Sequence, residues 1–336
     1  MQKFLLILSF LLNGLHLACA QNGNPIVVQH GDLLSYATSL DNALSIAATG
    51  DAIYLPAGSF STQSGISKKV SIYGVGYRRD VADISGVTVI QGNINVTSSA
   101  TGTLISGVHI QTSLTFVDAN IDNFILTNCK IASIVSGSTQ WNPCINAWAI
   151  TSVTIKECVI LNTIMSKLGG GCNHRINFNI QNSIIQPQLF GDNFNVTNCV
   201  ILNSGNAAAF DFNSSSVTNS IIYANYVNSI GSSYFNNNLI VGIPNSGIDT
   251  TNRQNLYKAS TYRDTVFVNN TTTNFNEEND YHTKPACTVC ANKGIYSGAT
   301  PYKPLPANPH LVSKVIPNSV NGQSLRFEIR VRLSNQ

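Results

Sequence analysis

The sequence predicts an all-β fold in which the chain winds through stacked, parallel coils. Two observations carry this prediction: six nine-residue segments align column by column, and the apolar residues within each segment alternate as they do in a strand. The segments are residues 123–131, 152–160, 177–185, 193–201, 214–222 and 232–240. Segments that repeat along a chain in this way are units that cannot bury an apolar face alone, so they must stack on one another.

Four columns of this alignment describe the inside of a coil. Column four is always apolar and column nine is always isoleucine, so both should point into a dry interior. Column six is asparagine in five segments and glutamate in one, and column seven is Cys, Ser or Asn. Asparagine tolerates the backbone of a sharp bend and can hydrogen-bond an asparagine in the next coil. Columns six and seven therefore predict a corner with an asparagine ladder, followed by a small inward-pointing residue.

The spacing between coils is irregular. Successive column-four residues lie between 16 and 29 positions apart. Such variation argues against a strict helical repeat and favours coils whose turns accept insertions. We expect one domain over residues 21–336, with a cap at about 25–50, coils at about 51–250, and irregular coils with a closing strand at about 251–336.

The N-terminus has the features of an export signal. Lys3 precedes the apolar run at residues 4–12, and Ala18-Cys19-Ala20 provides a small-x-small cleavage site. We predict a signal peptide over residues 1–20, cleaved after Ala20, and hence a secreted, cell-surface or periplasmic protein. Lipidation at Cys19 is the alternative, although His16 stands where such signals usually have an aliphatic residue. No other apolar run approaches the ~20 residues needed to span a membrane.

Both ends of the coil region are expected to be covered. An amphipathic helix over residues 33–48 should cap the first coil, because an open end would leave a sheet edge unpaired and the core exposed. Its apolar stripe is Leu33, Leu34, Leu40, Ala43, Leu44 and Ala47. Near the C-terminus, residues 324–334 alternate between an apolar face and a face with three Arg and one Glu, which predicts a terminal strand with one wet face.

The segment from Leu40 to Gly76 resembles a known family. LDNALSIAATGDAIYLPAGSFST followed by KKVSIYGVG is similar to the entry of right-handed parallel β-helix proteins of the pectate-lyase-like superfamily, as are the asparagine ladder and the inward Cys, Ser and Ile stacks. The tail GIYSGATPYKP (294–304) with NPH (308–310) looks like the close of many secreted bacterial β-helix proteins of unassigned function. The resemblance implies a right-handed parallel β-helix with an N-terminal capping α-helix, and it implies no particular activity.

Composition narrows the choice of partners. Only 10% of the residues are charged, and the formal net charge is +3. There is no Lys/Arg block and no stripe of basic and aromatic residues, so we expect no nucleic-acid partner. Nor do we expect a cofactor; calcium would enter only if the protein were a polysaccharide lyase.

The cysteines fall into two groups. Three occupy column seven and should be buried thiols that act as small apolar residues, namely Cys129, Cys158 and Cys199. Cys144 and Cys172 lie in the two longest insertions between coils. Because those insertions are consecutive, they should be neighbours, and the two cysteines could form a disulfide in an oxidising compartment.

Cys287 and Cys290 form a lone CxxC motif. A redox role would require a helix N-terminus in a βαβ setting, and zinc would require more ligands than nearby His282 supplies. The prediction is a structural disulfide in a C-terminal loop.

Candidate catalytic residues are scarce. Glycoside hydrolysis needs two carboxylates across one bond, and Asp192 and Asp211 are the nearest approximation, one coil apart; they could equally be turn-capping residues. A lyase would need a base together with carboxylates for calcium, and no such cluster is visible. The sequence strings typical of polygalacturonases and pectate lyases are missing.

Ligand binding is predicted at the two long insertions, near residues 132–151 and 162–176. Exposed aromatic rings beside polar and cationic groups suit sugars, which need a flat face for stacking and donors for their oxygens. The candidate residues are Trp141, Trp148, Lys167, His174 and Arg175. Trp148 lies in the apolar stretch INAWAI and could instead pack beneath its loop.

The sequence thus favours a non-catalytic protein that binds polysaccharide along one face of the coils. A polysaccharide lyase or glycoside hydrolase with a divergent site is the first alternative. A structural or adhesive spacer that binds a protein partner is the second. Fold analogy alone cannot choose among them.

Overall fold

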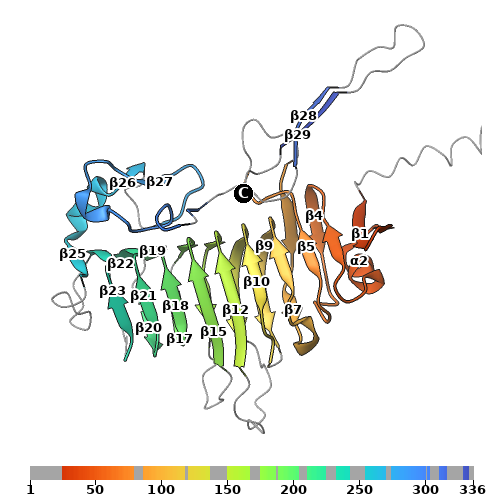
Figure 1. Ribbon diagram of the computed structural model, residues 1–336, viewed down its shortest axis with the longest axis horizontal. Coiled ribbons are helices and arrows are strands. Elements are labelled where there is room, and N and C mark those ends of the chain that lie inside the picture. The colour runs from red at the N-terminus through yellow and green to blue at the C-terminus, as the bar shows by residue number, and fades with distance from the viewer. Residues whose placement is uncertain are drawn as a thin grey trace, which may run out of the picture.

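The structure is a computed structural model, and it describes residues 25–78, 86–117, 120–136, 150–166, 175–186, 188–203, 210–224, 232–242, 254–269, 274–299, 301–302, 310–315 and 328–332. Two long sheets, of 11 and 14 strands, run along the molecule (Figure 1). Almost all neighbouring strands within them are parallel. The predicted all-β class and the parallel solenoid are therefore confirmed.

The 11-stranded sheet contains one strand from each coil, preceded by an antiparallel hairpin. Its strands, in spatial order, are β2 (Leu33–Ala37), β1 (Ile26–His30), β3 (Ala52–Tyr54), β5 (Ser71–Tyr73), β8 (Leu104–Ser106), β10 (Phe124–Thr127), β12 (Ile150–Lys156), β15 (Arg175–Gln181), β18 (Phe194–Thr197), β21 (Ser216–Thr218) and β23 (Tyr234–Asn236). From β3 onward every pairing is parallel. This sheet holds columns one to five of the repeat.

The 14-stranded sheet is branched. Its strands are β4 (Gly58–Ser61), β6 (Thr88–Gln91), β7 (Ile94–Val96), β9 (His109–Phe116), β11 (Lys130–Ser136), β13 (Val159–Ile160), β14 (Thr163–Met165), β16 (Ile184–Ile185), β17 (Gln188–Asp192), β19 (Val200–Asn203), β20 (Phe210–Asn213), β22 (Ile221–Ala224), β24 (Leu239–Gly242) and β25 (Leu256–Lys258). The long strand β11 pairs with both β13 and β14, so the sheet divides there into two limbs.

Strand register reproduces the column alignment. Leu126 lies opposite Ile155, and the same pairing continues through the remaining coils. The column-four residues in register are Leu126, Ile155, Ile180, Val196, Val217 and Phe235. They are buried in one continuous core with the column-nine isoleucines Ile131, Ile160, Ile185, Ile201, Ile222 and Ile240.

The corner between the two sheets has the predicted backbone. All six column-six residues have left-handed φ angles between 47° and 55°, at Asn128, Glu157, Asn182, Asn198, Asn219 and Asn237. Asparagine enters this region more readily than most residues because its short amide can bond locally. Asn237 also donates its amide to Asn219 Oδ1 over 2.8 Å, which forms one rung of the ladder.

Column seven behaves differently from the prediction of simple apolar thiols. These residues are fully buried, but each carries a hydrogen-bonding atom that serves the neighbouring coil. Cys158 N–H donates to Ser183 Oγ (3.1 Å), Cys199 N–H to Ser220 Oγ (3.1 Å), and Ser220 N–H to Asn238 Oδ1 (2.9 Å). The bend turns these amides away from the sheet ladder, so a side chain must accept them. Small polar residues are needed here for that reason.

The predicted helix over residues 33–48 is wrong in its first part. Residues Leu33–Ala37 form strand β2, and the helix α2 spans only Leu40–Ile46. Gly31, with φ 57°, allows the chain to turn and pair β2 with β1. Leu33 and Leu34, expected in the apolar stripe, are 71% and 56% exposed. The rest of the stripe, Leu40, Ala43, Leu44 and Ala47, is buried in the core.

A C-terminal arm, residues 274–302, packs against the outer face of the 14-stranded sheet (Figure 1). Column eight of the repeat points outward there and is apolar, at Val159, Ile184, Val200, Ile221 and Leu239. Tyr281, Ile295 and Tyr302 of the arm share a second buried core with them. The arm follows η2 (Ser260–Thr265) and β26 (Phe267–Asn269), and it contains β27 (Asp280–Thr283) and η3 (Thr288–Cys290).

Two glycines let the arm lie directly on the asparagine corner. Asn182 donates its amide to the carbonyls of Ile295 (2.9 Å) and Ser297 (3.0 Å). Gly294 and Gly298 have φ angles of 84° and 82°, and a Cβ at Gly298 would collide with the Asn198 amide. The GIYSG stretch therefore owes its glycines to both the backbone angle and the close approach.

The predicted terminal strand lies partly outside the described residues. Within the described residues it is β29 (Glu328–Arg332), which pairs antiparallel with β28 (His310–Val315). The two form a separate hairpin, hydrogen-bonded to neither long sheet.

Candidate functional site

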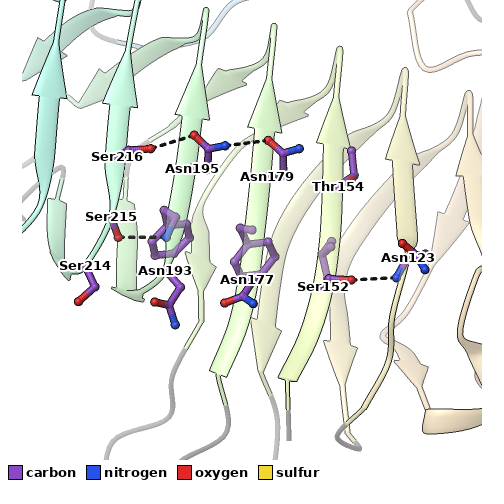
Figure 2. Close-up of a pocket in the computed structure, with 13 residues that line it drawn as sticks. Asn123, Ser152, Thr154, Asn177, Asn179, Asn193, Asn195, Ser214, Ser215 and Ser216 are labelled. Carbon is purple, nitrogen blue, oxygen red and sulfur yellow. Dashed lines mark hydrogen bonds between the residues drawn. The ribbon is translucent and has the colours of Figure 1, made fainter.

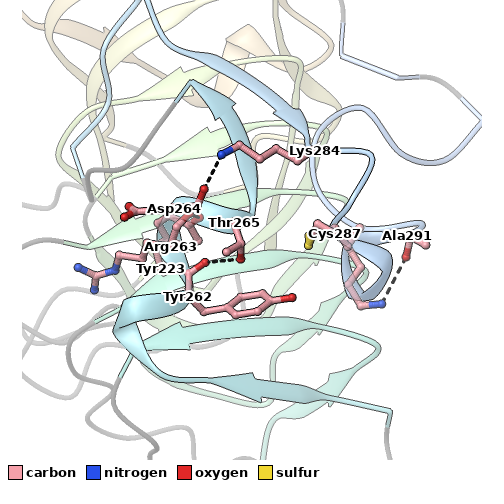
Figure 3. The surroundings of a disulfide bond; sticks show 10 residues. Tyr223, Tyr262, Arg263, Asp264, Thr265, Lys284, Cys287 and Ala291 are labelled. Carbon is pink, nitrogen blue, oxygen red and sulfur yellow. Dashed lines mark hydrogen bonds between the residues drawn. A yellow bond between two sulfur atoms is a disulfide. The ribbon is translucent and has the colours of Figure 1, made fainter.

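Most of the predicted binding residues lie outside the described part of the chain. This applies to Trp141, Trp148, Lys167 and His174, and also to the proposed disulfide partners Cys144 and Cys172. Arg175 is described only as the first residue of β15. The second predicted disulfide, Cys287–Cys290, is present in the structure (Figure 3).

The two candidate carboxylates lie on neighbouring strands. Asp192 ends β17, and Asp211 lies on β20. Asp192 is in register with Asn213, and Asp211 with Phe190, so the two aspartates are offset by two residues. Strands ~4.8 Å apart with a rise of ~3.3 Å per residue put their Cα atoms ~8 Å apart. The Asp192 side chain is half-buried.

A shallow groove of about 540 Å³ crosses the 11-stranded sheet instead (Figure 2). It runs over β10, β12, β15, β18 and β21, at right angles to the strands. Its lining residues are Asn123, Ser152, Val153, Thr154, Asn177, Phe178, Asn179, Asn193, Phe194, Asn195, Ser214, Ser215 and Ser216. The phenylalanines and Val153 are buried, so the accessible polar side chains come from the outward-facing columns one and three.

These polar side chains form two rows. The lower row in Figure 2 is Asn123, Ser152, Asn177, Asn193 and Ser214; the upper row is Thr154, Asn179, Asn195 and Ser216. Parallel register places successive members of the upper row directly opposite one another. The groups therefore repeat at the strand spacing of about 4.8 Å.

Hydrogen bonds hold the upper row in place. Ser216 Oγ donates to Asn195 Oδ1 (2.8 Å), and Asn195 Nδ2 lies 3.5 Å from Asn179 Oδ1. Gln181 Nε2 also donates to Asn179 Oδ1 (3.3 Å). Each amide still has donor or acceptor capacity beyond these bonds. The groove is thus a partly ordered array of neutral groups that can both donate and accept.

A third row, in column five, runs beside the groove and continues to the N-terminal end of the sheet. It begins with Tyr54 and Tyr73, whose rings stack at 5.4 Å with 22° between their planes. Further along it contains Lys156, which lies 3.5 Å from the Glu157 carboxylate. At the opposite end of the sheet, column three ends in Tyr234, which is 45% exposed. Aromatic rings therefore flank the polar rows along the sheet.

The side chains that line the groove are all uncharged. Its lining residues carry no ionisable side chain, and so provide neither a general acid nor a base. Within the described ranges, no cluster of three or more His, Cys, Asp or Glu side chains could hold a metal ion. What it does provide is uncharged hydrogen-bonding groups at regular intervals, which suit an extended polymer that carries hydroxyl groups.

The groove could have been anticipated from the aligned segments. Columns one and three, read down the six segments, are mostly Asn, Ser and Thr. Polarity alone does not distinguish a solvated face from a binding face, so these columns are only a weak signal in the sequence.

Comparison with known proteins identifies no relative: no protein family, no curated protein and no solved structure matches the chain. Among the residues that the structure describes, no helix has the length and apolar character to cross a membrane.

Proposed function

We propose that this is a secreted or surface-associated, non-catalytic protein that binds polysaccharide along the outer face of the 11-stranded sheet. In this proposal the solenoid is a right-handed parallel β-helix of the pectate-lyase-like kind, and α2 caps its N-terminal end. The observation that carries the proposal is the groove with its two rows of neutral amide and hydroxyl groups; the upper row is in register across four strands, and the lower row has one member in each of five coils.

The arrangement suits a glycan that crosses the strands. Four intervals of ~4.8 Å give a groove ~19 Å long, enough for several sugar units. A net gain of only ~1 kcal/mol is usual for one hydrogen bond, so affinity must come from many bonds made together. Regular spacing along an extended chain provides that multiplicity. The tyrosines at the ends of the sheet would add stacking surface.

The neutral lining also bears on the class of glycan. Lys156 is a cation beside the groove, and its charge is offset by Glu157 at 3.5 Å. Arg175 begins β15 two residues before Asn177 of the groove, and its side chain lies outside the described part of the structure. A polyanionic chain would gain little from such a surface, whereas neutral hydroxyls find matching donors and acceptors. We therefore propose neutral polysaccharides as the preferred ligands.

A hydrolytic function is the second candidate, and one observation favours it. Asp192 and Asp211 occupy neighbouring strands of the 14-stranded sheet, two residues out of register, and glycoside hydrolysis requires two carboxylates across one bond. Their offset by two residues leaves this pair less aligned than the rows of the groove. A spacer that binds a protein partner is the remaining alternative.

The test is affinity electrophoresis of the mature protein through gels that contain neutral or acidic polysaccharides. We expect retardation in at least one neutral polymer, and its loss in Thr154→Trp, which obstructs the groove, and in the double variant Asn179→Ala/Asn195→Ala. The matched control is Gln91→Ala, which removes an exposed amide from the 14-stranded sheet. Far-UV circular dichroism should show that all variants keep the fold.

Each other outcome points to a different reading. Retardation that is lost only in Trp141→Ala or Trp148→Ala would move binding to the predicted loops and contradict the groove. A cleared zone in the gel, abolished by Asp192→Asn, would make the protein an enzyme. Free migration through every polymer would favour the spacer.

A further inference from the structure

A second, smaller pocket lies within the C-terminal arm, beside the Cys287–Cys290 disulfide. Its volume is about 160 Å³, well below the ~300–1,000 Å³ of pockets for drug-sized ligands. It is lined by Tyr281, Thr283, Cys290, Ala291, Asn292, Lys293, Ile295, Tyr296 and Ser297. Only a small molecule, or one end of a larger molecule, fits such a space.

The unusual member of this lining is Lys293. It is only 8% exposed, yet its ammonium group makes one hydrogen bond, to the Ala291 carbonyl at 3.3 Å. Other lysines have stronger partners: Lys130 pairs with Glu277, and Lys156 lies 3.5 Å from Glu157. Within the described part of the chain Lys293 has no carboxylate within ion-pair distance. A buried ammonium with three donors and one neutral acceptor is unfavourable unless something else compensates its charge.

Burial also lowers the pKa of the Lys293 ammonium, in the direction expected when desolvation opposes the charged form. An anion in the pocket would remove that penalty.

The rest of the lining is suited to an anion. It contains no Asp or Glu, and Thr283 and Asn292 bring a hydroxyl and an amide to the same space. Ser297 lines the pocket too, but its hydroxyl donates to the Gly294 carbonyl (2.6 Å). Tyr296 forms a wall whose ring stacks on His282 at 3.6 Å with 7° between the planes. The disulfide closes the turn that contains η3, directly before Ala291, and the Lys293 N–H donates to the Cys290 carbonyl at 3.1 Å, which ties the Lys293 backbone to that turn.

We propose that this pocket binds a small oxyanion, a carboxylate or a phosphate, with Lys293 as its cationic anchor. The site is separate from the groove on the 11-stranded sheet, and the proposal holds whether or not that groove binds glycan. The geometry that carries it is a buried, nearly unpartnered ammonium facing a pocket without carboxylates.

The experiment uses the mature protein with sodium acetate and sodium phosphate as probes, against sodium chloride at matched ionic strength. A ligand that binds only the folded state raises Tm in proportion to the logarithm of its concentration once it exceeds Kd. We expect acetate, phosphate or both to raise Tm beyond chloride, and Lys293→Met to abolish that difference. Lys284→Met is the matched control, because Lys284 lies in the same arm, outside the pocket, and donates to the Asp264 carbonyl (Figure 3).

The two probes distinguish the source of the anion, since a response to acetate alone assigns a carboxylate and a response to phosphate alone assigns a phosphate. Calorimetric titration of the wild type and of Thr283→Val provides a second measurement that does not depend on the folding of Lys293→Met, and weaker binding by Thr283→Val is expected. Equal Tm shifts in chloride and in both oxyanions would overturn the proposal. An oxyanion shift that persists in Lys293→Met would overturn it as well.

Discussion

Replacing Ser220 with alanine should test the buried hydrogen-bond chain that joins the coils at column seven. Ser220 is fully buried, and its Oγ accepts the Cys199 N–H at 3.1 Å while donating to the Thr218 carbonyl at 2.9 Å. Alanine removes both bonds with almost no change in volume or in backbone preference. The Cys199 amide is then left inside the solenoid without an acceptor from the next coil.

The expected cost follows from these contacts. An unsatisfied buried N–H costs about 1–3 kcal/mol, and a lost donor bond costs about 0.5–1.5 kcal/mol. The cost of the lost donor bond should lie at the low end of its range, because the Thr218 carbonyl keeps a hydrogen bond from Asn198 N–H at 3.1 Å. We expect Ser220→Ala to lower the free energy of unfolding by about 2.5 kcal/mol. At an unfolding entropy of ~2.1 cal/mol/K per residue, a domain of about 300 residues should lose about 4 °C in Tm.

Equilibrium unfolding in urea, followed by both circular dichroism and fluorescence, measures this change; coincident transitions justify a two-state free energy. Ser220→Cys should lose less than Ser220→Ala, because Cys158 Sγ accepts the Cys129 N–H in the same way at 3.4 Å. Ser216→Ala, in the same coil but facing out from β21, should stay within ~0.5 kcal/mol of wild type. The reasoning fails if Ser220→Ala is as stable as Ser216→Ala, or if Ser220→Cys is no better than Ser220→Ala.

Three further predictions use the same unfolding assay. Glu157→Asn should raise the free energy of unfolding by ~0.5–1 kcal/mol, because Glu157 has a φ of 55° and asparagine tolerates this left-handed backbone region better than glutamate. A lower free energy of unfolding would contradict the idea that Glu157 strains the backbone at this corner. Gly298→Ala should lower the free energy of unfolding by ~2 kcal/mol and speed proteolysis of the arm, because Gly298 has a φ of 82° and its added Cβ would collide with the Asn198 side chain. Unchanged proteolysis would argue against close docking of the arm. Burial alone would raise the Asp51 pKa, but hydrogen bonds from His30 (2.6 Å) and a backbone amide lower it overall. Its contribution to stability should therefore be present above ~pH 4 and lost as the pH falls further, so Asp51→Asn should flatten the acid side of a Tm–pH curve.

Where local chemistry decides the structure, the sequence was a good guide. The positive φ angles at Asn128, Asn182, Asn198 and their counterparts follow from the preference of asparagine for sharp bends, and the stacking follows from columns four and nine. Residues 33–48 show the limit. Leu33 and Leu34 fit a helical stripe as well as a strand, and only the Gly31 turn, which pairs β2 with β1, decides between them.

Features that depend on distant contacts could not be derived in the same way. The arm that contains Lys293 lies on coils more than 70 residues earlier in the chain, as in the bond from Gly294 to Asn219. The apolar character of column eight was a usable signal that both faces of those strands are buried, but it does not identify which segment covers them.

The two outer faces of the solenoid are built for different purposes. Column eight is apolar in five of the six segments, and the C-terminal arm covers it; columns one and three are mostly polar, and along the groove they remain accessible. A face that had only to stay in water would be served as well by Lys and Glu, which also protect sheets against association. The groove instead carries neutral amides and hydroxyls across five successive strands. Stripping water from such groups costs less than stripping it from charges, and their bonds to a partner recover that cost. Solubility alone does not account for that choice of residues, whereas the proposed binding of a neutral, hydroxyl-rich polymer does.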